Sequence, residues 1–277
     1  MISKCYFPKD LKVRQVVNFM GYVEILPDDV TDGWFGLLTN GTTNITISLG
    51  SSDVEYNNSK GNSLLFTSYS LPTALKKKKG MKFLQLQLKP FGFYYLKQMP
   101  STDLCNKILT LDTFFKSSEC EMLLDKLLSS SSPEKIFETM ESFLSERLDL
   151  DRFDNRLPYS ISLIKKQQDI GLDHLSDAVC LSPRRFRELF RNMTGLSPSY
   201  NKKVVRFKSA SKQMEQAPNI PLTQIALANN YYDQAHFIKD FKTFSGITPK
   251  QFLRQKVKSA DFYNFDLDNI HKFAKSD

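Results

Sequence analysis

Residues 181–198 read LSPRRFRELFRNMTGLSP, and residues 232–249 read YDQAHFIKDFKTFSGITP. The two segments share a pattern in which four residues of the first recur 51 positions later in the second: Phe186, Phe190, Gly195 and Pro198 become Phe237, Phe241, Gly246 and Pro249. A short apolar stretch precedes each segment, at 172–179 and at 222–228. Such internal repetition marks a supersecondary unit that occurs twice. The pattern predicts a short helix, a tight turn and a capped helix, and then the same three elements again.

Each longer helix of this repeat has a clear start and two different faces. Ser182 is a good N-cap with Pro183 at the first helical position, and Asp233 has the capping place in the second copy. The phenylalanines of each copy share one face, which predicts the core contacts. The outward faces carry Arg184, Arg187, Glu188 and Arg191 in the first copy and Gln234, Ala235, Ile238, Lys239 and Lys242 in the second. A helix-turn-helix with such a face suits the major groove of DNA, because arginine binds guanine edges bidentately and a helix N-terminus favours phosphate.

The segment between the two copies, residues 198–215, reads as a single helix with apolar and basic residues at helical spacing. A rigid connector of this kind would fix the two recognition helices relative to each other. Successive major grooves on one face of DNA lie about 34 Å apart. We expect phosphate contacts from basic residues around both recognition helices and on the connector: Arg185, Arg191, Lys202, Lys203, His236 and Lys242.

The charge of the chain, formally +8 at pH 7, is unevenly distributed. Residues 1–155 hold 18 Lys and Arg against 19 Asp and Glu, whereas residues 156–260 hold 18 against 7. A basic region joined to a near-neutral one indicates a polyanionic ligand for the basic region alone. A merely solvated basic surface would give the same composition. The charge is therefore additional support for nucleic-acid binding, and the repeated motif is the main evidence.

The first half has the two-residue period of β-strands. Residues 44–49, 63–67 and 81–88 alternate or cluster apolar side chains between turn residues, and residues 34–38 read as a further strand. From about Thr102 the period becomes helical, with helices expected over 121–128 and 133–148, the latter capped by Ser132. The lysines at 76–79 are expected in an exposed loop, and Asp28, Asp29 and Asp32 in a turn. Aromatic side chains of the strands fill either a core or an apolar pocket.

The chain carries few features of an enzyme. Its three histidines, His174, His236 and His271, all lie in the second half, so a cupin-type metal site is not expected in residues 1–155. The chain has no G-x-S-x-G, H-E-x-x-H or P-loop motif. Its four cysteines, at 5, 105, 120 and 180, are too widely spaced for a zinc ribbon or a redox motif. We expect no cofactor, no metal and no catalytic residue.

Residues from about 160 to 254 resemble the C-terminal DNA-binding domain of AraC/XylS-family transcription regulators. The resemblance is carried by Ile225-Ala226, by the run from Asn230 to Phe237 and by Gly246-Ile247-Thr248-Pro249. It implies seven helices with two helix-turn-helix units. It also implies that outward residues near the start of each recognition helix touch bases, which are here Arg184, Arg187 and Glu188, and Gln234, Ala235, Ile238 and Lys239.

The sequence departs from the family pattern at the turns. Asn230-Tyr231 stands where Gly-Phe is usual, and Cys180 and Ser176 stand where the family commonly has Gly and Ala. Asn tolerates the left-handed conformation, so that the turn can survive. Because Ala235 and Ile238 offer no hydrogen bonds to bases, we expect the first copy to carry most of the base recognition; Ile238 suits a thymine methyl group. The first half weakly resembles the family's N-terminal domains, which bind effectors or dimerise.

The sequence therefore predicts an α+β chain: an N-terminal β-rich region, cupin-like or related, with helices at 1–150, an AraC-type DNA-binding domain at 156–256 and a tail at 257–277. The expected function is sequence-specific binding of double-stranded DNA in a cytoplasmic, soluble regulator, with RNA polymerase as a partner and without a membrane span. A small-molecule effector, a homodimer, and activation or repression stay open. The alternative of a DNA-repair enzyme with an alkyl-accepting cysteine needs an activated thiol, and an RNA-binding or structural protein lacks the matching motifs.

Overall fold

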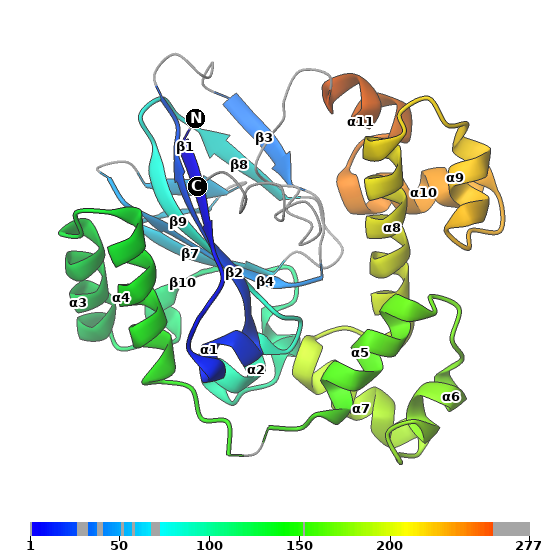
Figure 1. Cartoon of the computed structure of the whole chain (residues 1–277), viewed down its shortest axis with the longest axis horizontal. Coiled ribbons are helices and arrows are strands. Elements are labelled where there is room, and N and C mark those ends of the chain that lie inside the picture. Colours follow the sequence, from blue (N-terminus) through cyan, green and yellow to red (C-terminus); the bar gives the residue numbers. More distant parts are fainter. Residues whose placement is uncertain are drawn as a thin grey trace.

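The computed structural model describes residues 2–26, 33–37, 41–50, 53–56, 59–67, 73–151 and 153–256. A β-rich region with helices precedes an entirely helical region, and the two lie side by side (Figure 1). The predicted α+β class is confirmed. The tail at 257–277 and the acidic group at 28–32 lie outside the described residues.

The β-rich region consists of two antiparallel sheets. The larger has the order β1-β2-β9-β4-β7-β10 and the smaller has the order β3-β8-β5-β6. The bounds in the larger sheet are β1 Ile2–Tyr6, β2 Val17–Glu24, β9 Lys82–Leu88, β4 Thr43–Ser48, β7 Ser63–Thr67 and β10 Ile108–Thr110. Those in the smaller sheet are β3 Gly33–Leu37, β8 Thr73–Lys77, β5 Val54–Tyr56 and β6 Ser59–Gly61. The strands expected at 44–49, 63–67 and 81–88 are therefore present as β4, β7 and β9.

One face of the larger sheet packs on the smaller sheet. Phe83 and Leu64 share a buried cluster with Tyr56 and Leu75 of the smaller sheet, and the Tyr56 hydroxyl lies 2.8 Å from Thr46 Oγ1. The strand register places further polar side chains of β4 and β9 on this same face, namely Asn44, Ser48, Gln85 and Gln87. The described interior is thus lined partly by amides and hydroxyls, whereas the sequence predicted that aromatic side chains fill a core or line an apolar pocket.

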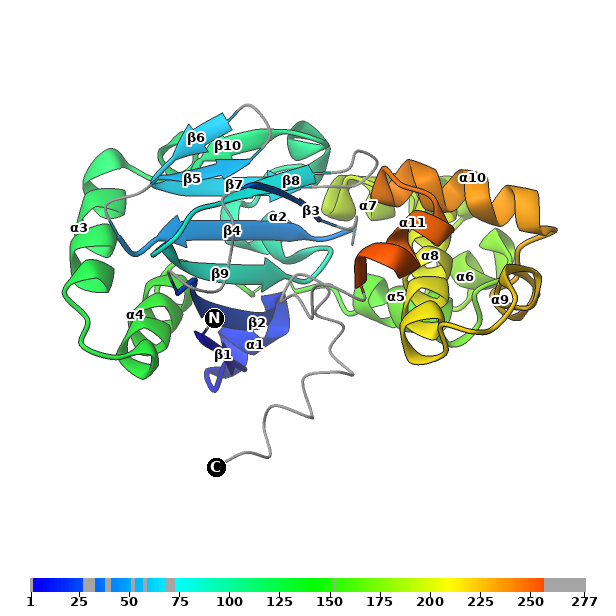
Figure 2. The same ribbon diagram turned by 90° about the horizontal axis from the view of Figure 1, so that it is seen from above.

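Four helices lie against the sheet region: α1 (Leu11–Val16), α2 (Gly92–Lys97), α3 (Ser117–Leu128) and α4 (Pro133–Ser145). Alternate residues of the strands, such as Ile45, Ile47 and Leu84, share a buried core with these helices. Ser132 caps α4 as predicted, because its hydroxyl accepts a hydrogen bond from the Lys135 amide at 3.3 Å. Figures 1 and 2 show α3 and α4 at the side of the sheets away from the helical region.

Two expectations for the first half were wrong. The stretch after Thr102 is not one helix: it forms the 3-10 turns η1 (Ser101–Leu104) and η2 (Leu111–Thr113) with β10 between them. Asn106, with φ of 56°, turns the chain, and Ile108–Thr110 then pairs with β7. The lysine run is not wholly a loop either, because Lys76 and Lys77 belong to β8. The ammonium groups of Lys76 and Lys78 lie 3.3 and 3.8 Å from Glu55.

The described helical region has seven helices: α5 (Arg156–Lys166), α6 (Leu172–Asp177), α7 (Pro183–Thr194), α8 (Pro198–Gln216), α9 (Leu222–Ala228), α10 (Gln234–Ser245) and α11 (Pro249–Lys256). The expected repeat is present as the helix pairs α6–α7 and α9–α10, which α8 connects (Figure 1). None of the helices in the described ranges is both long and apolar enough to cross a membrane.

The first helix pair is packed directly on the β-rich region. Phe186, Phe190 and Met193 of α7 belong to the same buried core as the sheet and its helices, whereas α8 to α11 have a core of their own. The buried Ser101 hydroxyl of η1 donates to the Met193 carbonyl at 2.8 Å, and the Cys105 thiol donates to the Gly195 carbonyl at 3.1 Å. The C-terminal end of α7 is therefore held by the turn η1.

We predict that Ser101→Ala lowers the free energy of unfolding by about 1–2 kcal/mol, because it removes a buried hydrogen bond and leaves the Met193 carbonyl without this donor. Urea titration followed by circular dichroism measures this loss. Ser199→Ala on the exposed side of α8 is the matched control and should change stability by less than about 0.5 kcal/mol. Equal effects of the two substitutions would contradict the role given to Ser101.

Candidate nucleic-acid interface

The two longer helices of the repeat begin and end in the same way. The Ser182 hydroxyl accepts from the Arg185 amide at 3.3 Å, and Asp233 Oδ1 accepts from the His236 amide at 2.7 Å. Gly195 and Gly246 end the helices with the same φ of 76°, in the left-handed region that favours glycine. The predicted N-caps are confirmed, and both helix starts are well defined and accessible.

The turns inside the two helix pairs also match. Cys180 and Asn230 both have a left-handed backbone, with φ of 54° and 58°. In each copy the next amide closes the turn: Leu181 donates to Ser176 at 3.0 Å, and Tyr231 donates to Ala226 at 3.0 Å. The departures Cys180 and Asn230 therefore leave the turn intact, although a cysteine in this conformation costs backbone energy that glycine would not.

The outward face of α7 is a basic surface with one carboxylate in it. The side chains of Arg184 and Arg185 are 89% and 71% exposed and donate to Glu188 at 3.2 and 3.3 Å. These hydrogen bonds, the one from Arg184 first, lower the pKa of Glu188, so that it stays ionised. Arg187 and Arg191 are exposed on the same helix. The five charged residues predicted on α7 are thus all accessible, and three of them form a connected group.

The outward face of α10 is less charged and partly occupied. Ala235, Lys239 and Lys242 are exposed, as predicted. Gln234 Oε1 accepts from the Thr223 hydroxyl of α9 at 2.6 Å, and Ile238 packs against the core of the second helix pair. Two of the four residues expected to touch bases in this copy therefore also hold α10 in place.

Three residues expected at phosphates have partners inside the protein. Lys202 donates to the Ile170 carbonyl at 2.9 Å. Lys203 Nζ and His236 Nε2 lie 3.6 and 3.5 Å from the carboxylate of Asp240, a nearly buried residue of α10. Of the predicted phosphate contacts, Arg185, Arg191 and Lys242 are exposed residues, and the Lys203 side chain is 45% exposed beside Asp240. The phosphate roles of Lys202, Lys203 and His236 stay predictions.

Asp240 is a residue of this site that the sequence analysis missed. Besides Lys203 and His236, Arg206 of α8 lies 3.9 Å from its carboxylate. Arg206 also donates to the Asn230 carbonyl at 2.9 Å and stacks over the Tyr231 ring. The cluster therefore joins α8, the turn and α10. A signal existed, because Phe237, Asp240, Phe241 and Phe244 form one i, i+3, i+4, i+7 stripe, in which a carboxylate predicts buried partners.

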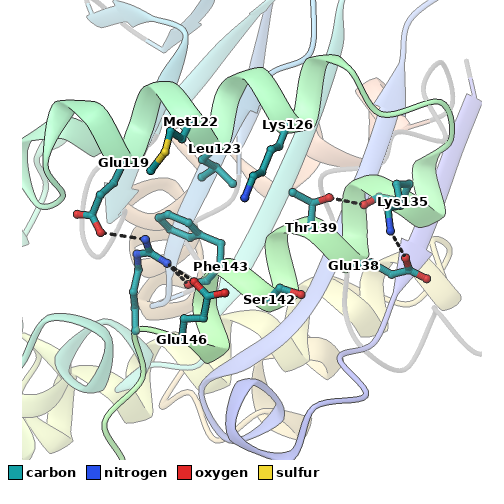
Figure 3. Close-up of a pocket in the computed structure, with 11 residues that line it drawn as sticks. Glu119, Met122, Leu123, Lys126, Lys135, Glu138, Thr139, Ser142, Phe143 and Glu146 are labelled. Carbon is teal, nitrogen blue, oxygen red and sulfur yellow. Dashed lines mark hydrogen bonds and ion pairs between the residues drawn. The ribbon is translucent and has the colours of Figure 1, made fainter.

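Three of the cysteines and a groove between two helices of the first half were candidates for a competing site. Burial raises the pKa of the Cys5 thiol to about 11 and raises the pKa of Cys105 and Cys120, which is opposite to the activation a nucleophilic thiol needs. The groove between α3 and α4 has a volume of about 510 Å³ (Figure 3). Its Arg147 pairs with Glu119 at 2.9 Å and Glu146 at 3.2 Å. Over the described ranges, no three His, Cys, Asp or Glu residues are grouped to hold a metal ion.

Replacing Cys180 by glycine should stabilise the chain by about 0.5–1 kcal/mol, because glycine adopts the left-handed conformation without strain. Asn230→Gly should gain less, since asparagine already tolerates this conformation. Thermal unfolding midpoints of the two variants and of the unchanged chain test whether Cys180→Gly gains more stability than Asn230→Gly. A larger gain for Asn230→Gly would contradict the backbone argument.

Substitution of Asp240 by asparagine should lower the free energy of unfolding by about 1–3 kcal/mol, because it leaves two or three cations without their shared carboxylate. Chemical denaturation of the full chain measures the loss. Asp177→Asn, at an exposed position on α6, is the matched control and should be nearly neutral. No difference between the two would show that the cluster does not hold α10.

Comparison with known proteins points to the same segment. A protein-family model described as "Helix-turn-helix domain" matches residues 175–255. An uncharacterized HTH-type transcriptional regulator of Haemophilus influenzae is 31% identical over 101 residues, which are 36% of this chain and 34% of that protein. The chain thus matches about a third of the length of that curated relative.

Two solved structures align with this chain at low structural similarity. A transcriptional regulator of Chromobacterium violaceum with an AraC-type DNA-binding domain has 23% identity and a TM-score of 0.36, over 38% of this chain and 96% of its own. Unsaturated fatty acid-bound ToxT of Vibrio cholerae has 12% identity and a TM-score of 0.46, over 94% and 97%. The family-model match agrees with the AraC-type signature residues found in the sequence. Residues 175–255 are therefore a helix-turn-helix domain of the AraC type.

Proposed function

We propose that this chain is a cytoplasmic, sequence-specific DNA-binding regulator of transcription, in which α7 and α10 read base edges in adjacent major-groove segments. The observation that carries the proposal is the outward face of α7, where five charged side chains lie opposite the buried Phe186 and Phe190. Because the helix N-terminus is capped by Ser182 and exposed, it favours phosphate and presents the first residues to the groove.

The group formed by Arg184, Arg185 and Glu188 supports a division of labour on α7. A guanidinium that leaves Glu188 can bind a guanine edge with two hydrogen bonds, while the carboxylate accepts from the amino group of a cytosine. In the proposal Arg184, Arg187 and Glu188 read bases, and Arg185 and Arg191 bind the backbone. When an arginine leaves Glu188, its hydrogen bonds to the carboxylate are replaced by hydrogen bonds to DNA. This exchange of partners therefore costs little free energy.

The second helix pair contributes less to base recognition in this proposal. Gln234 and Lys239 supply hydrogen bonds, and Ala235 and Ile238 supply apolar contact with thymine methyl groups. Lys242 is exposed for a phosphate, whereas Lys202, Lys203 and His236 reach one only by leaving the partners described above. The connector α8 has 19 residues and is therefore about 28 Å long, which suits two helices placed in neighbouring grooves.

The β-rich region would regulate this binding. Its amide-lined interior includes two buried oxygens, Asn44 Oδ1 and Gln85 Oε1, without a hydrogen-bond partner in the described part of the chain. Such atoms are satisfied by water or by a ligand. We propose a small-molecule effector, a homodimer and RNA polymerase as further partners of the regulator.

Selection of bound duplexes from a random DNA pool, with the full chain at physiological salt, tests the proposed function. We expect an enriched motif with two half-elements about one helical turn apart. A single element would mean that α10 binds only the backbone. Absence of both enrichment and salt-dependent binding would overturn the proposal.

On the selected duplex, Arg187→Ala should weaken binding by about 1–3 kcal/mol and relax the preference at one base position. Lys242→Ala, a matched loss of one exposed positive charge, should weaken binding evenly across sequences and reduce the salt dependence by about one ion. Fluorescence anisotropy at several salt concentrations separates the two effects. An Arg187→Ala variant that keeps its sequence preference would remove this residue from base recognition.

A further inference from the structure

An open cavity of about 440 Å³ lies where the two halves of the chain are joined. Four segments line it: Gln15 of α1, Lys89 and Phe91 after β9, the linker around Phe153 and Asn155, and the start of α5. The volume is within the range of small-molecule sites, and such sites often lie between structural units. It is distinct from both the DNA-binding face of α7 and the interior between the sheets.

Lys89 is the charged residue among those that line this cavity, and it is half-buried. Among the residues that the structure describes, no hydrogen bond or ion pair is found for its ammonium group. Burial lowers the pKa of Lys89, and the neighbouring cations Lys165 and Arg14 lower it further. A half-buried ammonium group beside two more cations favours the binding of an anion. A negative group lowers both the desolvation cost of the ammonium group and its repulsion by the neighbouring cations.

Uncharged hydrogen-bonding groups stand beside the lysine. Gln15 and Asn155 both line the cavity and are exposed, and neither side chain has a partner among the residues that the structure describes. An amide supplies both donors and an acceptor, so these two side chains are able to hydrogen-bond a polar group that enters the cavity.

The remaining wall is apolar and includes the aromatic rings of Phe91 and Phe153 beside Leu150 and Pro158. The Phe91 and Phe153 rings meet edge to face with their centroids 6.0 Å apart, and the Tyr95 ring is tilted against Phe153 with the centroids 4.7 Å apart. The Tyr95 hydroxyl also accepts from the Asp154 amide at 2.8 Å, which holds the linker against α2. A preformed apolar wall beside a cation suits a ligand with an apolar body and an anionic end.

We propose that this cavity binds a small organic carboxylate on a ring or a short aliphatic chain, with the carboxylate at Lys89 and the apolar body on Phe91 and Phe153. Such a ligand would contact α1, the linker and α5 at once. It would therefore fix the linker to the first half. One part of this inference rests on the proposed function: binding of the carboxylate changes the affinity of the protein for DNA. By linkage, binding of DNA changes the affinity of the protein for the carboxylate by the same factor.

Calorimetric titration of the full chain, without DNA, tests the binding. The probes are benzoate and hexanoate, with benzamide as the neutral counterpart and inorganic phosphate as an anion without an apolar body. We expect both carboxylates to bind and both comparison compounds to bind at least tenfold more weakly. Lys89→Met should weaken benzoate binding by about 10- to 100-fold, the range of one charge-assisted hydrogen bond.

Controls keep this test independent of folding. Lys107→Met removes an exposed lysine outside the cavity and should leave benzoate binding unchanged. Lys89→Met should melt no lower than the unchanged chain, because it removes a half-buried charge repelled by its neighbours. Benzoate should raise the melting temperature of the unchanged chain and not that of Lys89→Met.

Three outcomes would overturn the carboxylate site. The first is equal binding of benzoate and benzamide, which would leave an apolar surface only. The second is phosphate binding as tight as benzoate and lost on adding the selected duplex, which would make Lys89 a DNA contact. The third is no binding of either carboxylate at millimolar concentration. Because binding is measured without DNA, its failure is separate from a failure of the proposed function, which the duplex selection decides.

Discussion

Phe186, Phe190 and Met193 of α7 lie in the same buried core as the side chains of the larger sheet, and η1 holds the end of the helix through Ser101 and Cys105. The helix that carries most of the outward positive charge is therefore also part of the packing of the first half. Because protein cores are close-packed, a shift of the sheet helices displaces α7 as well. This contact gives the β-rich region a direct physical route to the basic face.

The charges of the helical region divide into two kinds. Those on α7 are exposed, and the only carboxylate among them, Glu188, pairs with flexible arginine side chains. Those around Asp240 surround a buried carboxylate and are paired across α8 and α10. The first kind is available for exchange with phosphate or bases. The charges around Asp240 hold α10 against α8, and they leave fewer lysines available for DNA.

The sequence predicted those parts of the structure that depend on local signals. Caps at Ser182, Asp233 and Ser132, the paired phenylalanines, and strands with a two-residue period follow from propensity and spacing. The stretch after Thr102 was mispredicted as helical because Leu104, Ile108 and Leu111 have helical spacing, whereas pairing of Ile108–Thr110 with the distant β7 decides the structure. The partners of Asp240 and the cavity at Lys89 depend on contacts between segments far apart in the chain, which no local pattern specifies.

The second helix pair has a core separate from the rest, built by α8 to α11 around Phe207, Phe237 and Phe241. A cooperative unit with its own core can open without the remainder of the molecule unfolding. Release from DNA would then proceed in steps, with α10 leaving and rebinding while α7 still holds its groove. In the proposed complex, the residence time on DNA would then depend on two successive barriers, one for each helix pair.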